Sequence, residues 1–508
     1  MNWRKYLKWA GILSIPILIL LIFRYNAILD NDLWYVLTEG RYITEHGIYY
    51  IDPFSMHPNL DVIAQNWLAS IIFWLAYSIF GPGGLILLVI LANVVICILL
   101  YKLCMTISQQ NQKISIFIML LTDIILCFTF IVARGQIFTF INTLALFLLL
   151  ESYIKTNKSK YLYGIPLISI LEVNLHSAYW LMIPLFMVPY LIDSFKNKKL
   201  HLQGYRQKPL FITFITTILV GLINPYGIGA MLFIFTSFTD ANMHDIIIEL
   251  QPPQFFNFAD PYTILNALTI IIPIVCYICF GKNRLHIRYI LLCLGTLVLS
   301  LISLKGLSHF ILVSFFPLAS ILPNNKTVTL LFKKPKWLKK SKVYRKVHLF
   351  HTSHSFPIVQ NVLYGTIIAL CFLIFIEDLN TTNFTHPSAN AVNTIDLFAQ
   401  HNPNTTVYTP FNAGGYVEFR GYRAYITPQA ELFLKKNNHQ ADIFNEYYRL
   451  QYENSIDIID FLTKYNFDYL LLTGDDQILS IDISEYYTPI YNAEGSPYLA
   501  YIRNDLSP

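Results

Sequence analysis

The chain has 508 residues, of which 55% are hydrophobic, 15% aromatic and only 13% charged, and its mean hydropathy is +0.48. These values exclude a soluble globular protein, a collagen and a disordered protein. The apolar residues form blocks of roughly 15 to 22, whereas a membrane β-barrel would show alternating segments of about 10. The seven cysteines lie in or beside these blocks, which excludes a disulfide scaffold. We therefore predict an all-α bundle that crosses a membrane many times.

Positive charge is concentrated in six segments between the apolar blocks. They hold 25 of the 36 Lys and Arg residues but only two acidic residues, Glu151 and Asp193. Because Lys and Arg favour cytoplasmic loops, these segments are predicted to be cytoplasmic. The segments are 1–8, 101–113, 151–160, 193–209, 281–288 and 323–356.

The charge pattern also predicts the number of crossings, because a chain that runs between two cytoplasmic segments crosses the membrane an even number of times. The total is about eleven transmembrane helices, with the N-terminus cytoplasmic and the C-terminus outside the cell membrane. The expected elements are a helix at 9–23, an outer loop at 24–82, a helix at 83–102, hairpins at 114–152, 161–192, 209–280 and 287–322, and a helix at 357–376. The hairpins are expected to turn at 133–136, 172–176, 224–261 and 303–309.

Two apolar blocks need separate interpretation. The block 67–80 is short and precedes Gly81-Pro82-Gly83-Gly84, so we predict an interfacial helix on the outer face. The block 161–192 is too short for two full crossings, so its turn at 172–176 should dip toward the membrane. Polar backbone at that depth must face protein or a water-filled cavity. Asp123 lies within the third crossing, where a hydrogen bond to a neighbouring helix is the main expectation and a proton pathway is the alternative.

The composition changes after residue 376, which predicts a membrane domain at 1–376 and an extracytoplasmic α/β domain at 377–508. This second domain shows no phosphate-binding loop, dinucleotide fingerprint or zinc spacing, and no nucleic-acid partner is expected. Its expected elements are strands at 406–410, 422–426 and 469–472, a turn at 412–415, a helix at 455–465, and a hairpin of 487–491 with 498–502.

Polar side chains that the composition does not explain fall on the outer side of this topology. A polar cluster at the mouth of an apolar bundle suits a substrate with one apolar and one polar end, such as a lipid-linked sugar. Ordinary solvation of outer loops is the alternative interpretation. The cluster comprises Asp30, Asp32, Asp52, Gln65, Asn66, Arg134, Gln136, Glu172, Asn174, His176, Asn224, Glu249, Gln251, Lys305 and His309.

An acidic residue after the first helix, a loop that ends in an interfacial helix and short hairpins after it resemble the GT-C class of membrane glycosyltransferases, which includes protein mannosyltransferases and aminoarabinose transferases. The chain is most similar to a group of bacterial membrane proteins without an assigned activity. It departs from them at Gln65-Asn66-Trp67, where His-Glu-Trp is usual, and at Ser308-His309, where Arg-His is usual. The matching motifs are Asp30-Asn31-Asp32-Leu33-Trp34, Asp52-Pro53-Phe54-Ser55, Asn174-Leu175-His176, Asn224-Pro225-Tyr226-Gly227, Glu249-Leu250-Gln251-Pro252-Pro253 and Gly414-Gly415-Tyr416.

This resemblance implies transfer of a sugar from a polyprenyl-phosphate carrier to an extracytoplasmic acceptor, with inversion at the anomeric carbon. An acceptor hydroxyl needs a carboxylate to take its proton, and Asp32 is the first candidate, with Asp30 second. The lipid phosphate needs cationic donors, for which Arg134 is the first candidate, with Lys305, His176 and His309 as helpers. The substrate-lining candidates are Trp34, Asp52, Gln65, Gln136, Asn174, Asn224, Glu249 and Gln251.

No cofactor is required by these motifs, although Asp30 and Asp32 could hold a divalent metal through oxygen ligands. Two alternatives to a transferase stay open. A lipid-carrier transporter or flippase would show ionisable residues along the membrane and internal repeats, and the sequence has neither. A non-catalytic assembly partner or a glycan polymerase would instead act mainly through the outer domain.

Overall fold

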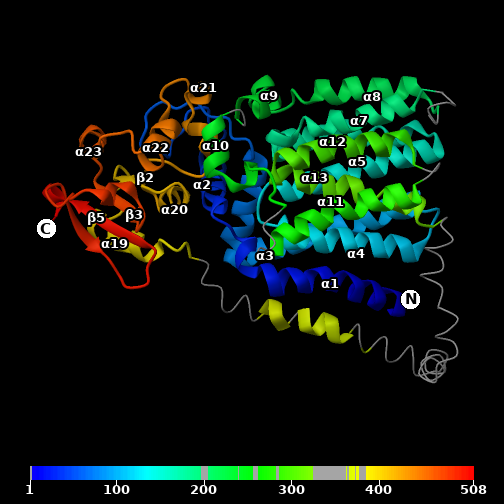
Figure 1. Ribbon diagram of the computed structural model, residues 1–508, viewed down its shortest axis with the longest axis horizontal. Helices are drawn as coiled ribbons and strands as arrows, with labels where there is room; N and C mark the ends of the chain where they lie inside the picture. Colours follow the sequence, from blue (N-terminus) through cyan, green and yellow to red (C-terminus); the bar gives the residue numbers. More distant parts are fainter. Residues whose placement is uncertain are drawn as a thin grey trace.

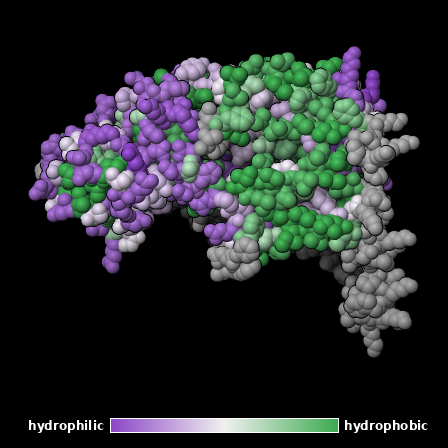
Figure 2. All heavy atoms as spheres, turned by 45° about the horizontal axis from the view of Figure 1, so that its top comes forward, coloured by the Kyte–Doolittle hydropathy of each residue, from purple (hydrophilic) through white to green (hydrophobic). Residues whose placement is uncertain are grey.

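The computed structural model describes residues 3–195, 204–237, 240–255, 261–281, 285–323, 362, 365–371, 373–376 and 385–507. Long helices lie side by side, and the C-terminal α/β part lies at one end of this bundle (Figure 1). Apolar residues cover the visible surface of the bundle, whereas the surface of the C-terminal part is mainly polar (Figure 2). The predicted boundary at 376/377 lies outside the described residues, as does most of the basic segment 323–356.

The membrane part is made mainly of helices, and a longer connection joins α2 to α3. Its helices are α1 (Trp3–Ile28), α2 (Asp32–His46), α3 (Trp67–Ile107), α4 (Gln112–Thr129), α5 (Gln136–Thr156), α6 (Gly164–Leu175), α7 (Met182–Asp193), α8 (Gln207–Val220), α9 (Ile228–Ser237), α10 (Ala241–Ile246), α11 (Pro261–Phe280), α12 (Ile287–Ile302), α13 (Leu304–Phe315) and α14 (Leu318–Ile321).

Within the described residues, five helices are long and apolar enough to cross a membrane. Shorter apolar helices accompany them, including those at Trp9–Ile22, Gln207–Val220 and Ile287–Ile302. These helices fit the predicted membrane bundle, and the total of about eleven crossings stays a prediction.

The outer loop 24–82 contains a helix, α2, that was not predicted. Its buried residues include Leu33, Leu37 and Gly40, which recur at helical spacing. The helix ends at Gly47, whose φ of 87° suits glycine. A Cβ atom at Gly40 would collide with the Ser70 carbonyl, so α2 and α3 pack closely here.

Helix α3 has a sharp break at Gly81, where φ is 60° and ψ is −154°. The break separates the predicted interfacial segment 67–80 from the predicted crossing at 83–102. Pro82 follows it and cannot donate the helical hydrogen bond. Further along α3, Asn93 donates to the buried Asp123 carboxylate of α4 at 3.3 Å. Asp123 therefore has the hydrogen bond to a neighbouring helix that its sequence position predicts.

The turn predicted at 303–309 is shorter than expected. Only Ser303 separates α12 from α13, and its side chain accepts a hydrogen bond from the Gly306 backbone. This cap starts α13 early, because a serine hydroxyl satisfies a backbone donor of the first helical turn. Lys305 and His309 consequently lie on a helix and not in a loop.

Three residues from segments that are predicted to be cytoplasmic form a buried ion cluster. Arg288 contacts Glu151 at 3.0 Å and Asp193 at 2.7 Å. All three side chains are at most 5% exposed. The cluster joins the ends of α5 and α7 to the start of α12, so these ends lie on one side of the bundle, as the charge pattern predicts.

Replacing Arg288 should destabilise the bundle strongly. Arg288→Met leaves two carboxylates buried without their cation, which typically costs about 3–5 kcal/mol. The measurement is the midpoint of thermal unfolding in detergent. Lys155→Met, which removes an exposed positive charge at the same end of the bundle, is the control and should change the midpoint little. Equal midpoints for the Arg288 variant and the wild type would contradict the structural role of the cluster.

The C-terminal part contains a mixed five-stranded sheet of order β2-β1-β3-β5-β4. β1 pairs in parallel with β2 and β3, and β5 pairs antiparallel with β3 and β4. The α/β class is therefore as predicted. The strands are β1 (Thr406–Tyr408), β2 (Arg423–Ala424), β3 (Tyr469–Thr473), β4 (Tyr487–Tyr491) and β5 (Tyr498–Arg503). The helices are α19 (Ala389–Ala399), α20 (Gly414–Phe419), α21 (Lys435–Asn438), α22 (Ile443–Gln451) and α23 (Ile458–Tyr465).

The predicted turn at 412–415 is wrong in its second half, because α20 begins at Gly414. A Cβ atom at Gly414 would collide with the Ile426 carbonyl. One at Gly415 would lie 3.2 Å from the Tyr35 backbone nitrogen of α2. The two glycines therefore allow α20 to pack closely on both β2 and α2, which places the C-terminal part against the outer loop.

Candidate active site

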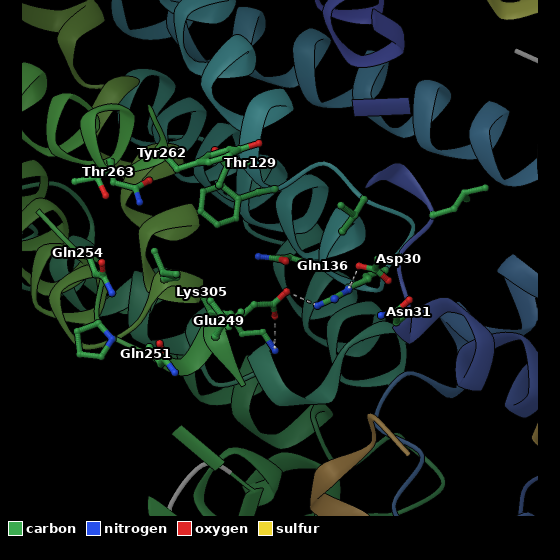
Figure 3. Close-up of a pocket in the computed structure, with 18 residues that line it drawn as sticks. Asp30, Asn31, Thr129, Gln136, Glu249, Gln251, Gln254, Tyr262, Thr263 and Lys305 are labelled. Carbon is green, nitrogen blue, oxygen red and sulfur yellow. Dashed lines mark hydrogen bonds and ion pairs between the residues drawn. The ribbon is translucent and has the colours of Figure 1, made fainter. Parts of the chain in front are cut away.

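Arg134 is the centre of the predicted polar cluster. Its Nε lies 2.5 Å from Asp30, and its Nη1 lies 2.6 Å from Glu249 and 3.2 Å from Asp32. Lys305 contacts the other oxygen of Glu249 at 3.2 Å. Figure 3 shows Asp30, Glu249 and Lys305 of this cluster, which come from separate segments of the chain. Charge-assisted contacts of this kind are stronger than neutral hydrogen bonds.

The fold explains this convergence. Asp30 follows α1, and Asp32 is the first residue of α2. Arg134 is in the short turn between α4 and α5, and Glu249 belongs to the 3-10 helix Ile248–Leu250. Lys305 lies in the first turn of α13. Four segments thus bring these charged residues to the end of the bundle that faces the C-terminal part (Figure 1).

Two cavities meet at this cluster. The larger has a volume of about 690 Å³ and lies beside α4, α11 and α13. The smaller has a volume of about 270 Å³ and lies between the membrane part and the C-terminal part. Asp30 lines the larger cavity and Asp32 the smaller one. The residues that line both are Arg134, Gln136, Ile248, Glu249 and Lys305.

The three carboxyl groups differ in their affinity for protons. Burial raises the pKa of Asp30 to about 7 and also raises that of Asp32, although Arg134 opposes both shifts. Burial acts in the same direction on Glu249, but Lys305 and Arg134 outweigh it and lower its pKa to about 2. Glu249 is therefore a stable anion, whereas Asp30 and Asp32 are more basic than ordinary aspartates.

The donor set around Asp30 and Asp32 does not fit a divalent metal. The Arg134 guanidinium already occupies the position between the two carboxylates. In the part of the chain that the structure describes, no three His, Cys, Asp or Glu residues form a group that could hold a metal ion.

His176 lines the smaller cavity and belongs to a second polar group. Its Nδ1 is 2.8 Å from the Thr139 hydroxyl, which donates to the buried Glu172 carboxylate at 2.6 Å. Asn142 donates to the other oxygen of Glu172 at 2.7 Å. These contacts fix the orientation of the imidazole ring at the cavity wall.

Nine predicted site residues line the cavities: Asp30, Asp32, Gln65, Arg134, Gln136, His176, Glu249, Gln251 and Lys305.

Five other predicted site residues do not line either cavity, and they contact neighbouring parts of the protein instead. Trp34 packs against Tyr416 and Phe419 of α20. Asp52 accepts a hydrogen bond from the Ser55 backbone, and Asn224 bonds the backbone of its own turn. Asn174 bonds Trp67 and two carbonyl groups, and His309 stacks on Tyr179.

The C-terminal part contributes residues that the sequence did not reveal. Phe411, Asn412 and Glu431 line the smaller cavity. Gln65 donates to Glu431 at 2.6 Å, and burial raises the pKa of Glu431 to about 7. The one sequence signal for these residues is that Asn412 and Glu431 follow predicted strands. Other wall residues missed by the sequence are Asn31, Tyr35, Thr129, Tyr179, Gln254, Tyr262, Thr263 and Asn266.

No known family model and no curated protein matches the sequence. The structure is similar to that of ArnT from Cupriavidus metallidurans, solved with undecaprenyl phosphate, with a TM-score of 0.53 and 11% identity over 98% of both chains. The Archaeoglobus fulgidus oligosaccharyltransferase, solved with zinc and sulfate, gives a TM-score of 0.49 and 11% identity over 97% of this chain and 73% of that one. The likeness to ArnT shows that the two chains share a fold, and this is the kind of fold that the resemblance of the motifs implies.

Proposed function

We propose that the chain is a membrane glycosyltransferase that moves a sugar from a polyprenyl-phosphate carrier to an extracytoplasmic acceptor. The observation that supports this most is the meeting of two cavities at Arg134, Glu249 and Lys305. A two-substrate transfer needs two adjoining sites with a cation at their junction, where the phosphate departs.

The larger cavity is the proposed donor site. Its walls include apolar side chains such as Phe130 and Leu304 and polar ones such as Asn266, which suits a prenyl chain with a polar head. Arg134 and Lys305 would hold the phosphate. ArnT, which has the same fold, was solved with undecaprenyl phosphate, and this analogy of fold supports the same class of carrier.

The smaller cavity is the proposed acceptor site, and Asp32 is its proposed base. The acceptor hydroxyl would give its proton to Asp32 while its oxygen forms a bond to the anomeric carbon. The bond from that carbon to the phosphate breaks, and the phosphate leaves with the electron pair. A single displacement from the opposite face inverts the anomeric carbon. Asp30 lines the other cavity and would act through Arg134.

The experiment that tests this proposal is transfer of labelled sugar from lipid-linked donors extracted from membranes that contain the chain. Purified protein should move label from the lipid fraction to the acceptor fraction. A transporter or flippase would instead move the labelled lipid between leaflets and leave the sugar attached. A non-catalytic partner or a polymerase component would leave the sugar–phosphate bond of a monosaccharide donor intact.

The proposed orientation predicts the result of a reporter-fusion experiment. Fusions after residues 60, 135, 175, 245 and 400 should report outside, because these positions belong to outer segments of the topology. Fusions after 108, 157, 202, 285 and 340 should report inside. An inside signal at 60 or 400 would put the proposed site on the wrong side of the membrane.

A further inference from the structure

Glu249 contacts both of the side chains that are proposed to bind the phosphate, Arg134 and Lys305. One carboxylate oxygen contacts Arg134 at 2.6 Å and the other contacts Lys305 at 3.2 Å. Its low pKa keeps the group ionised at neutral pH. A carboxylate that bridges an arginine and a lysine has the charge and geometry that a phosphate would bring to the same two side chains.

A phosphate ester and Glu249 cannot both neutralise these cations. Arg134 and Lys305 already face three carboxyl groups, those of Asp30, Asp32 and Glu249. Adding a phosphate without removing one of these groups would place further negative charge among them, and like charges at such distances repel strongly. Of the three, Glu249 is the one that contacts both cations.

We propose that Glu249 is a built-in counter-anion that the donor phosphate displaces, and that this exchange makes the site specific for phosphorylated lipids. The inference rests on the proposed donor site. An uncharged prenyl lipid has no group that can replace the carboxylate, so it leaves Glu249 on the two cations. A prenyl phosphate monoester supplies three free oxygens and up to two negative charges, so it competes with Glu249 for both cations. The sugar-linked donor is a phosphodiester with two free oxygens and one negative charge, which match the two oxygens and the single charge of the carboxylate that it displaces.

The position of Glu249 gives the exchange a structural consequence. Glu249, Arg134 and Lys305 form the common wall of the two cavities, so displacement of Glu249 opens this wall where the phosphate departs. The segment 240–251 also contacts the C-terminal part. Asn242 donates to Asn445 at 2.7 Å, and Tyr448 donates to Asp245 at 2.8 Å. Donor binding is therefore linked to a segment that borders the acceptor site.

The test is binding of farnesyl phosphate and of farnesol to the purified full-length chain. Glu249→Gln keeps the shape of the side chain but removes its charge. If Glu249 bridges the two cations in at least about nine of ten molecules, only about one molecule in ten is free to bind a phosphate. Removing the charge of Glu249 should then increase the affinity for farnesyl phosphate about tenfold or more. Farnesol binding should not change. In the wild type, farnesyl phosphate should also increase hydrogen exchange of amides in 241–250.

Asp245→Asn is the matched control, because it removes the same charge from the same segment and can still accept the bond from Tyr448. Its affinity for farnesyl phosphate should equal that of the wild type. Unchanged or weaker binding by Glu249→Gln, with normal binding by the wild type, would overturn the counter-anion role and leave the donor site intact. If both variants bound farnesyl phosphate equally more tightly than the wild type, the loss of one negative charge from the segment would explain the effect. This result would also overturn the counter-anion role of Glu249. Failure of the wild type to bind farnesyl phosphate would overturn the donor site itself.

Discussion

Asp32→Asn should reduce glycosyl transfer by about 10²- to 10⁴-fold, the usual loss when a general base is removed. Asparagine keeps the size of the side chain but cannot accept the proton of the acceptor hydroxyl. Because Asp32 lines the acceptor cavity and not the larger one, binding of the prenyl phosphate should survive. The measurement is transfer of labelled sugar in membranes, with carrier binding to the purified variant measured in parallel.

The pH dependence gives an independent check on Asp32. Burial raises its pKa above the ordinary value of 3.8. A base acts in its deprotonated form, so wild-type transfer should fall on acidification, and the fall should begin at a higher pH than for an ordinary aspartate. Asp30→Asn is the comparison, because Asp30 also bonds Arg134 but lines the other cavity. If Asp32→Asn and Asp30→Asn both transferred sugar at the wild-type rate, neither aspartate of the first outer loop would take part in the reaction.

Arg134→Ala should weaken both carrier binding and transfer. Hydrogen bonds to charged groups are worth about 1.5–3 kcal/mol, so the loss of this cation should reduce carrier affinity roughly 10- to 100-fold. The phosphate is charged before and after transfer, so Arg134→Ala should weaken binding of the carrier in the ground state. Asp32→Asn, in contrast, should lower the rate of transfer and leave carrier binding intact. The measurement is binding of undecaprenyl phosphate together with kcat and KM for transfer.

Arg134→Lys is the matched control for this prediction. Lysine keeps the positive charge but lacks the planar group with which Arg134 contacts Asp30, Asp32 and Glu249 together. Its affinity for the carrier should therefore be intermediate. Unchanged carrier binding by Arg134→Ala would contradict a phosphate-binding role for this residue.

The sequence predicts the charged centre of the site better than its walls. Asp30, Asp32, Arg134, Glu249 and Lys305 can be found because charged residues near apolar blocks are rare and fall on one side of the predicted topology. Their mutual contacts could not be predicted, since the distances depend on how four separate segments pack. The contacts of Arg134 with three carboxylates are visible only in the structure.

Residues with strong sequence motifs can also have purely local contacts. Trp34, Asp52 and Asn224 belong to matching motifs, yet they pack an interface or bond a turn. Conversely, Glu431 lies far along the chain in the C-terminal part and faces the cavity only because α20 packs on α2. Polar pattern and spacing do not distinguish a residue that bonds a turn from one that faces a cavity.

A structure of the full chain with bound undecaprenyl phosphate would test the donor site directly. We expect phosphate density between Arg134 and Lys305, the prenyl chain in the larger cavity beside α4 and α11, and Glu249 displaced from both cations. Phosphate density away from Arg134 and Lys305, with the Glu249 bridge intact, would contradict this expectation.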